Sequence, residues 1–145
     1  MKIKLFVSFL FLGLFISMNL QAQPVKNHGK LSVQGIQLTD EHGKATVLNG
    51  VSYGWHNWWP RFYNKESAKW LATDWKCSVV RAAMGVDPKK GYIDQPEWSK
   101  EKMEAVIQGA IESNIYVLID WHSHTLKLNE AKSFFIYIDS SLISI

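Results

Sequence analysis

Two short apolar runs, each ending in polar or ionisable side chains, are the clearest pattern along the chain. The first is S-V-V-R-A-A-M at 78–84, and the second is I-Y-V-L-I-D-W-H-S-H at 115–124. Both contain several β-branched residues, which predicts buried strands. Roughly thirty residues with a helical pattern separate the runs, so we predict consecutive parallel strands of a β-α-β array. Such folds place their functional groups at the carboxyl ends of the strands, which here carry Arg81, Asp120, His122 and His124.

Helical periodicity fills the intervals between and after these strands. Asn64 is a predicted cap for a helix over 65–75, where apolar residues recur three and four positions apart. A second helix is predicted over 99–113. A third is predicted to begin near 129, and its pattern ends at 135 because residues 136–145 are β-branched and serine-rich, with no alanine, lysine or glutamate.

The N-terminal region shows a different sequence of patterns. Two lysines, an apolar core of about a dozen residues and a small residue at Ala22 predict a secretory signal peptide over 1–22, cleaved after Ala22. The apolar core is shorter than the roughly 20 residues that a membrane-spanning helix needs. Residues 23–30 are a predicted flexible lead-in, and alternating runs over 31–38 and 45–48 predict a β-hairpin with its turn at D-E-H-G. A first sheet strand is predicted at 49–52.

The predicted signal peptide leads us to expect a secreted or periplasmic protein.

Charge and cysteine content limit the possible partners. The net charge of +3 falls to about +1 without the two lysines of the predicted signal peptide, so nothing favours nucleic acid or an anionic membrane as a partner. Cys77 is the only cysteine, and its place beside an apolar run predicts a buried thiol. No motif indicates a cofactor. All seven tryptophans lie between Trp55 and Trp121, where they could fill a core or stack on a flat apolar ligand such as a sugar ring.

Several linked motifs in order resemble glycoside hydrolase family 5, within its bacterial endoglucanase (cellulase) group. They are G-I-Q-L-T-D-E-H-G-K with L-N-G-V-S, W-H-N-W-W-P-R-F-Y, V-V-R-A-A-M, G-Y-I-D-Q-P and I-Y-V-L-I-D-W-H. The likeness runs from about Val33 to Phe135, which predicts one domain over 31–135. The resemblance implies an α/β fold, namely a partial (β/α)8 TIM barrel made of the N-terminal hairpin and about the first three β/α units. It further implies hydrolysis of β-1,4-linked glucan by a retaining mechanism with two glutamates.

The resemblance also assigns roles to individual residues. Arg81 matches the family arginine that hydrogen-bonds the nucleophilic glutamate and keeps it ionised. His122 matches the histidine that lines the cleft near the cleaved sugar. Trp58 falls on the aromatic platform for a sugar, and we group His56 and Trp59 with it as substrate-binding candidates. Trp58 and Trp59 are as compatible with core packing as with sugar stacking.

The chain departs from the family pattern at several positions. Many relatives have a histidine in the first loop where this chain has Gly54, and many have an aromatic residue after R-A-A-M where it has Gly85. The two family glutamates belong to strands four and seven, the first within an Asn-Glu-Pro motif. Asn129-Glu130 precedes alanine at a helix start, so we interpret Glu130 as a solvated first-turn residue. We thus predict no catalytic residue in this chain, and we interpret it as an N-terminal portion, truncated or frame-shifted, with a non-family tail at 136–145.

Three alternatives remain open. In the first, the chain is a fragment that a second polypeptide completes. It could bind glucan through Trp58, Trp59 and Trp98 without cutting it, as a binding module. His122 and His124 form a His-x-His pair on one face of a strand, and such a pair can bind a divalent metal in a metal-dependent barrel hydrolase. Since a metal site needs further ligands that the sequence does not indicate, we predict no metal.

Overall fold

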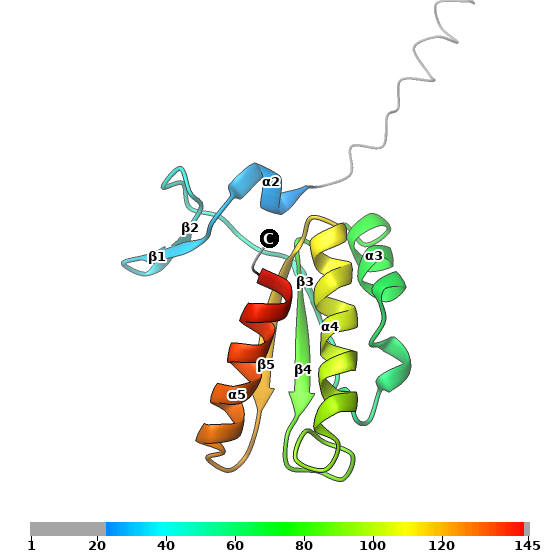
Figure 1. The fold of residues 1–145 in the computed structure, drawn as a ribbon. Helices are drawn as coiled ribbons and strands as arrows, with labels where there is room; N and C mark the ends of the chain where they lie inside the picture. The colour runs from blue at the N-terminus through cyan, green and yellow to red at the C-terminus, as the bar shows by residue number, and fades with distance from the viewer. Residues whose placement is uncertain (1–22, 144–145) are drawn as a thin grey trace, which may run out of the picture.

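A three-stranded parallel sheet forms the centre of the molecule (Figure 1). The computed structural model describes residues 23–143, so the predicted signal peptide lies outside the described residues. The strands are β3 (Gly50–Ser52), β4 (Val79–Gly85) and β5 (Tyr116–His122), in that order across the sheet. Ser52 pairs with Arg81, and Gly85 pairs with His122. This register confirms the predicted parallel strands and brings their carboxyl ends to one edge.

Three helices pack on the sheet. They are α3 (Lys65–Thr73), α4 (Pro96–Glu112) and α5 (Leu128–Ile138), and α3 lies beside α4 (Figure 1). The predicted cap of α3 is confirmed, because the Asn64 Oδ1 accepts a hydrogen bond from the Ser67 amide at 2.8 Å. Asn114 follows α4 with a φ of 59°, the left-handed conformation that commonly ends a helix. Between residues 23 and 143, no helix is long and apolar enough to cross a membrane.

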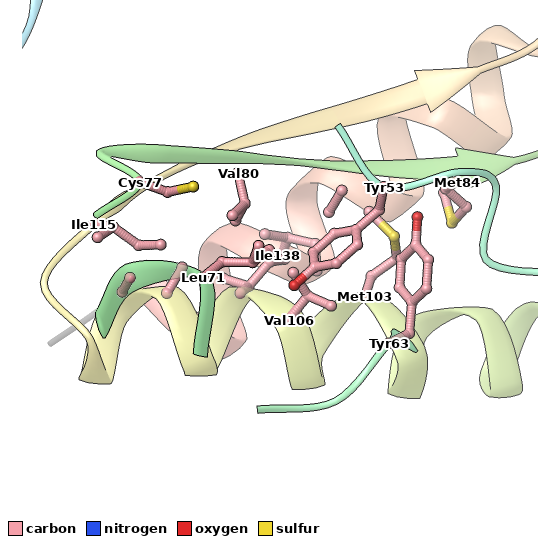
Figure 2. Close-up of a cluster of buried hydrophobic side chains, with 14 of the residues drawn as sticks. Tyr53, Tyr63, Leu71, Cys77, Val80, Met84, Met103, Val106, Ile115 and Ile138 are labelled. Atoms are coloured by element: carbon pink, nitrogen blue, oxygen red, sulfur yellow. The ribbon is translucent and has the colours of Figure 1, made fainter. Parts of the chain in front are cut away.

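One hydrophobic core joins the sheet to these helices (Figure 2). Alternate residues of a strand share one face, and Val80, Ala82 and Met84 of β4 are fully buried on the face that meets the helices. Ala83, on the opposite face, is fully buried as well. Met103 and Val106 of α4 meet them in the same cluster. Cys77 is buried and free, as predicted.

The end of the chain differs from the prediction. Helix α5 continues through Ile138 instead of ending near 135, and a short π-helical segment, η2 (Asp139–Ile143), follows it. Phe134 and Ile138 are buried in the core. Their four-residue spacing puts both on the face of α5 that meets the core, and burial of apolar surface outweighs the weak intrinsic helix propensity of β-branched residues.

The predicted flexible lead-in contains a helical turn, α2 (Pro24–His28). It is fixed to the sheet by hydrogen bonds from the Lys26 amide to Asn114 Oδ1 at 2.8 Å and from the Tyr116 hydroxyl to the Gly29 carbonyl at 2.7 Å. Helix α2 and the following hairpin therefore lie at the end of the sheet where the strands begin (Figure 1). The functional edge is at the opposite end.

The N-terminal hairpin has a different turn from the predicted one. Strands β1 (Ser32–Gln34) and β2 (Gln37–Thr39) pair directly through a tight turn at Gly35. The 45–48 run meets β2 only through a single bridge between Thr39 and Ala45. The predicted turn at 40–43 forms a separate loop, where Asp40 accepts hydrogen bonds from the His42 and Lys44 amides at 3.0 and 2.9 Å. These hydrogen bonds hold the pKa of Asp40 below its usual value, and the bond from the Lys44 amide has the largest effect.

Candidate functional site

Arg81, Asp120 and His122 form a hydrogen-bonded network at the carboxyl ends of β4 and β5. Arg81 Nη2 donates to Asp120 Oδ2 at 2.5 Å, and Arg81 Nη1 donates to Ser52 Oγ at 2.7 Å. His122 Nδ1 lies 3.0 Å from both Asp120 Oδ2 and Arg81 Nη2. The structure therefore brings together the two predicted supporting residues, Arg81 and His122. Sequence reasoning noticed Asp120 and assigned it no role, although it is the residue that joins them.

The electrostatics of this network are those of a half-exposed ion pair. The side chains of Arg81 and Asp120 retain about a third and a quarter of their accessible surface, so the pair contributes modestly to stability, in the range of about 1 kcal/mol or less. Its larger effect is geometric, because the guanidinium fixes the Asp120 carboxylate, which accepts a hydrogen bond from His122 Nδ1. No hydrogen bond within residues 23–143 occupies His122 Nε2. That nitrogen is left for a ligand.

Trp55 lies beside this network and was not predicted as a site residue. Its ring stacks on Trp58 with centroids 4.6 Å apart and planes 23° apart, and it meets the His122 ring at 4.6 Å. The His124 ring is 5.7 Å from it. The crowding of aromatic residues over 53–63 was the available signal, but a loop has no periodicity that tells which ring faces the strand ends.

The structure does not place His56 where the sequence analysis expected it, among the side chains that contact substrate. Its side chain is fully buried. The Gly85 amide donates to His56 Nδ1 at 3.2 Å, so the imidazole proton is on Nε2, which donates to Ser99 Oγ at 2.9 Å. The Ser99 hydroxyl in turn donates to the Gln95 carbonyl at 2.7 Å. Burial lowers the pKa of His56 to about 4, so it is a neutral core residue that links the first loop to α4, and it cannot reach a sugar here.

Trp58 and Trp59 are exposed, as a binding role requires. Trp59 lies over Gly54, where a Cβ would come within 2.5 Å of the indole Cδ1. Gly85 is crowded in the same way, because a Cβ there would lie 2.4 Å from Asn57 Oδ1 and 3.0 Å from Trp55 Cε3. Gly54 and Gly85, where many relatives have a larger residue, thus make room for aromatic and amide side chains of the first loop.

The loop after β5 is held by Asp87. This carboxylate accepts hydrogen bonds from Ser123 Oγ at 2.9 Å, the His124 amide at 3.0 Å and Thr125 Oγ1 at 2.8 Å. These hydrogen bonds hold the pKa of Asp87 below its usual value, and the bond from the Thr125 hydroxyl has the largest effect. His124 is exposed at the rim of the site.

The metal alternative has little support in the part of the chain that the structure describes. That part contains no group of three histidine, cysteine, aspartate or glutamate side chains arranged to hold a metal ion. His122 Nδ1 is next to the Arg81 guanidinium, whose positive charge opposes a cation at that position.

The glutamates of the chain lie on helices or in a loop and not on the strands of the sheet. One is in the loop after the hairpin and the others are on helices: Glu41, Glu66, Glu97, Glu101, Glu104, Glu112 and Glu130. Glu130 is exposed in the first turn of α5, as predicted. None of these carboxylates is on β3, β4 or β5.

An apolar hollow runs along the edge of β3 that has no neighbouring strand among the described residues. This apolar hollow, of about 430 Å³, is lined mainly by Val51, Tyr53, Trp59, Phe62, Trp70 and Trp75. Trp70 and Trp75 meet edge to face at 5.5 Å. The apolar hollow has few polar groups, in contrast to the strand-end network.

Comparison with known proteins gives consistent matches. The family described as Cellulase (glycosyl hydrolase family 5) matches residues 39–140, which extends five residues past the predicted boundary at 135. An endoglucanase of Clostridium saccharobutylicum is 42% identical over 113 residues, and endoglucanase N of Pectobacterium atrosepticum is 41% identical over 112 residues. These matches cover 74% and 77% of this chain and 25% of each relative, so the chain spans about a quarter of their length.

Solved structures agree with the sequence matches. A structure from Cytophaga hutchinsonii superposes with a TM-score of 0.76 at 42% identity, covering 81% of this chain and 39% of that one. The catalytic domain of the Thermobifida fusca endoglucanase Cel5A gives 0.73 at 34% identity, covering 81% and 40%. The same Thermobifida domain has been solved in complex with cellotetraose. These likenesses confirm the predicted partial barrel.

Proposed function

Because the chain belongs to the cellulase family, glycosyl hydrolase family 5, we propose that its strand-end residues form part of a cleft that binds β-1,4-linked glucan. The observation that carries the proposal is the exposed Trp58 ring, stacked through Trp55 against the Arg81–Asp120–His122 network. An apolar ring face beside fixed polar groups matches the chemistry of a sugar, which has flat apolar faces and hydroxyl edges. A solved relative in complex with cellotetraose supports the choice of glucan.

The 145-residue chain alone is proposed to bind glucan without hydrolysing it. Retaining hydrolysis requires two carboxyl groups about 5 to 5.5 Å apart, one as acid and one as nucleophile. Asp120 is the carboxylate in the network, and it is paired with Arg81 and His122. None of the seven glutamates is on β3, β4 or β5. Arg81 and His122 are therefore supporting residues of the cleft, and the predicted signal peptide supports export to where polysaccharide is encountered.

Retention on insoluble cellulose tests the binding proposal. Trp58→Ala removes the exposed ring and should abolish most of the retention. Trp75→Ala is the matched control, because Trp75 is equally exposed, both side chains at 61%, and lies at the apolar hollow. Equal retention of the wild-type and Trp58→Ala proteins would contradict the proposal.

Hydrolysis of carboxymethyl-cellulose is a separate test. We expect no release of reducing ends by the pure 145-residue chain at any pH between about 4 and 9, because the carboxylate that β3, β4 and β5 supply, Asp120, is already paired with Arg81 and His122. Turnover by pure protein, lost on Asp120→Asn, would show that Asp120 acts as a catalytic group and would contradict this part of the proposal.

A further inference from the structure

We propose that Trp55 is a positioning residue that supports both the Trp58 ring and the orientation of His122; this inference rests on the proposed glucan binding. Trp55 is the side chain that contacts both rings, at 4.6 Å in each case. Trp58 belongs to the loop after β3, whereas His122 ends β5. Trp55 therefore connects two segments that are more than sixty residues apart in sequence.

The backbone around Trp55 is held on several sides. The Trp58 and Trp59 amides both donate to the Trp55 carbonyl at 3.0 Å. The next residue, His56, is tied to β4 by its amide, which donates to the Ala83 carbonyl at 3.1 Å, and to α4 by its ring. A side chain whose own backbone is fixed in this way can act as a rigid support for its neighbours.

The space for the Trp55 ring is provided by Gly85. A Cβ on Gly85 would lie 3.0 Å from Trp55 Cε3 and 2.4 Å from Asn57 Oδ1. Gly85 is also the residue of β4 that pairs with His122 on β5. The missing side chain thus lets the indole pack directly at the strand position beside His122, which ties the glycine at 85 to the tryptophan at 55.

His122 depends on this support because its other contacts hold only one edge of the ring. Its Nδ1 is bound in the Arg81–Asp120 network, and its side chain is about one third exposed. The Trp55 ring is tilted by 50° against it, and the His124 ring lies 5.7 Å away. With Trp55 in place, the imidazole keeps Nδ1 on Asp120 and leaves Nε2 for a sugar hydroxyl.

Two measurements on the full 145-residue chain test the proposal. The first is the χ1 rotamer of His122, obtained by NMR from three-bond couplings of its Cγ. The second is the dissociation constant for cellotetraose. We expect one His122 rotamer in the wild-type protein and in Trp55→Phe, which keeps an aromatic face. Rotamer averaging and about tenfold weaker binding are expected in Trp55→Ala and in Trp55→Leu, as for the loss of an aromatic pair.

The outcomes separate this inference from the proposed function. A single His122 rotamer together with wild-type affinity in Trp55→Leu, which keeps apolar bulk if the alanine variant does not fold, would overturn the inference. Trp58→Ala should weaken binding while leaving the His122 rotamer of the free protein unchanged. If no variant and no wild-type protein binds cellotetraose, the proposed function fails, and a rotamer unaffected by loss of the Trp55 ring would then also refute the positioning role.

Discussion

The two faces of the sheet differ in what covers them. On one face, Val80 and Met84 of β4 are fully buried against the helices. On the other face of the same strands, Arg81 is half-buried and Leu118 of β5 is 57% exposed. Alternation along each strand places stabilising and functional side chains back to back. The helix-covered face thus accounts for stability and the open face for ligand chemistry, and substitutions on the two faces should have separable effects.

The largest effect is expected from Met84→Ala on the covered face. Met84 is fully buried, and truncation of a buried methionine to alanine costs about 2 to 5 kcal/mol of unfolding free energy. Leu118→Ala, on the open face, removes a side chain of similar size and should cost less than about 1 kcal/mol. Urea unfolding of both variants measures the difference. Equal losses would show that the open face is covered in solution.

A pH effect is expected from His56, which lies on the covered side. Its pKa is about 4 in the folded protein and about 6.5 when unfolded. Between these values the unfolded chain binds the extra proton, so stability falls as pH decreases from about 6.5 to 4, by about 3 kcal/mol in total. Unfolding free energies measured across this range should lose most of that slope in His56→Gln. His42→Gln, at an exposed turn, is the control and should leave the slope unchanged.

A smaller loss is expected from Tyr63→Phe. The buried Tyr63 hydroxyl accepts a hydrogen bond from the Ala83 amide at 3.0 Å and lies within 2.8 Å of the Gly54 and Ala83 carbonyls. Removing it leaves a buried amide unpaired, at about 1 to 3 kcal/mol. Tyr53→Phe is the control with a smaller expected loss, since its hydroxyl bonds Ser67, a half-buried side chain. Thermal unfolding compares the two, and a larger loss in the control would contradict this assignment.

The smallest effect on stability is expected from Arg81→Gln on the open face. Its ion pair with Asp120 is partly exposed, so the unfolding free energy should change by less than about 1 kcal/mol. The same substitution should impair cellotetraose binding, because it releases Asp120 and His122. A stability loss as large as that of Met84→Ala, measured in the same urea experiment, would show that the two faces are not separable.

The parts of the fold with strong periodicity were predictable from the sequence. Strands β4 and β5 and helices α3 and α4 follow from alternating or three-and-four spacing, together with the caps at Asn64 and Asn114. The turn at Gly35 was missed because the D-E-H-G segment carries a stronger turn composition. The extension of α5 to Ile138 was missed because tertiary burial overrides propensity there.

The candidate site was predictable only in part. Arg81 and His122 could be placed because strand ends meet at one edge of a parallel sheet. His56 could not, because its burial depends on Ser99, which is 43 residues away on α4. Trp55 likewise depends on the missing side chain at Gly85. Contacts between a loop and distant elements carry no local pattern, so sequence reasoning has no signal for them.

The most direct test of the two-face account is to map cellotetraose binding onto the chain by amide chemical shifts. The account predicts saturable changes confined to Trp55–Trp59, to the end of β4 around Gly85 and to His122–His124. The amides of α4 should not change. Shifts centred on Trp70 and Trp75 at the apolar hollow, or no saturable shift at concentrations up to about ten millimolar, a range that covers weak single-site binding, would contradict it.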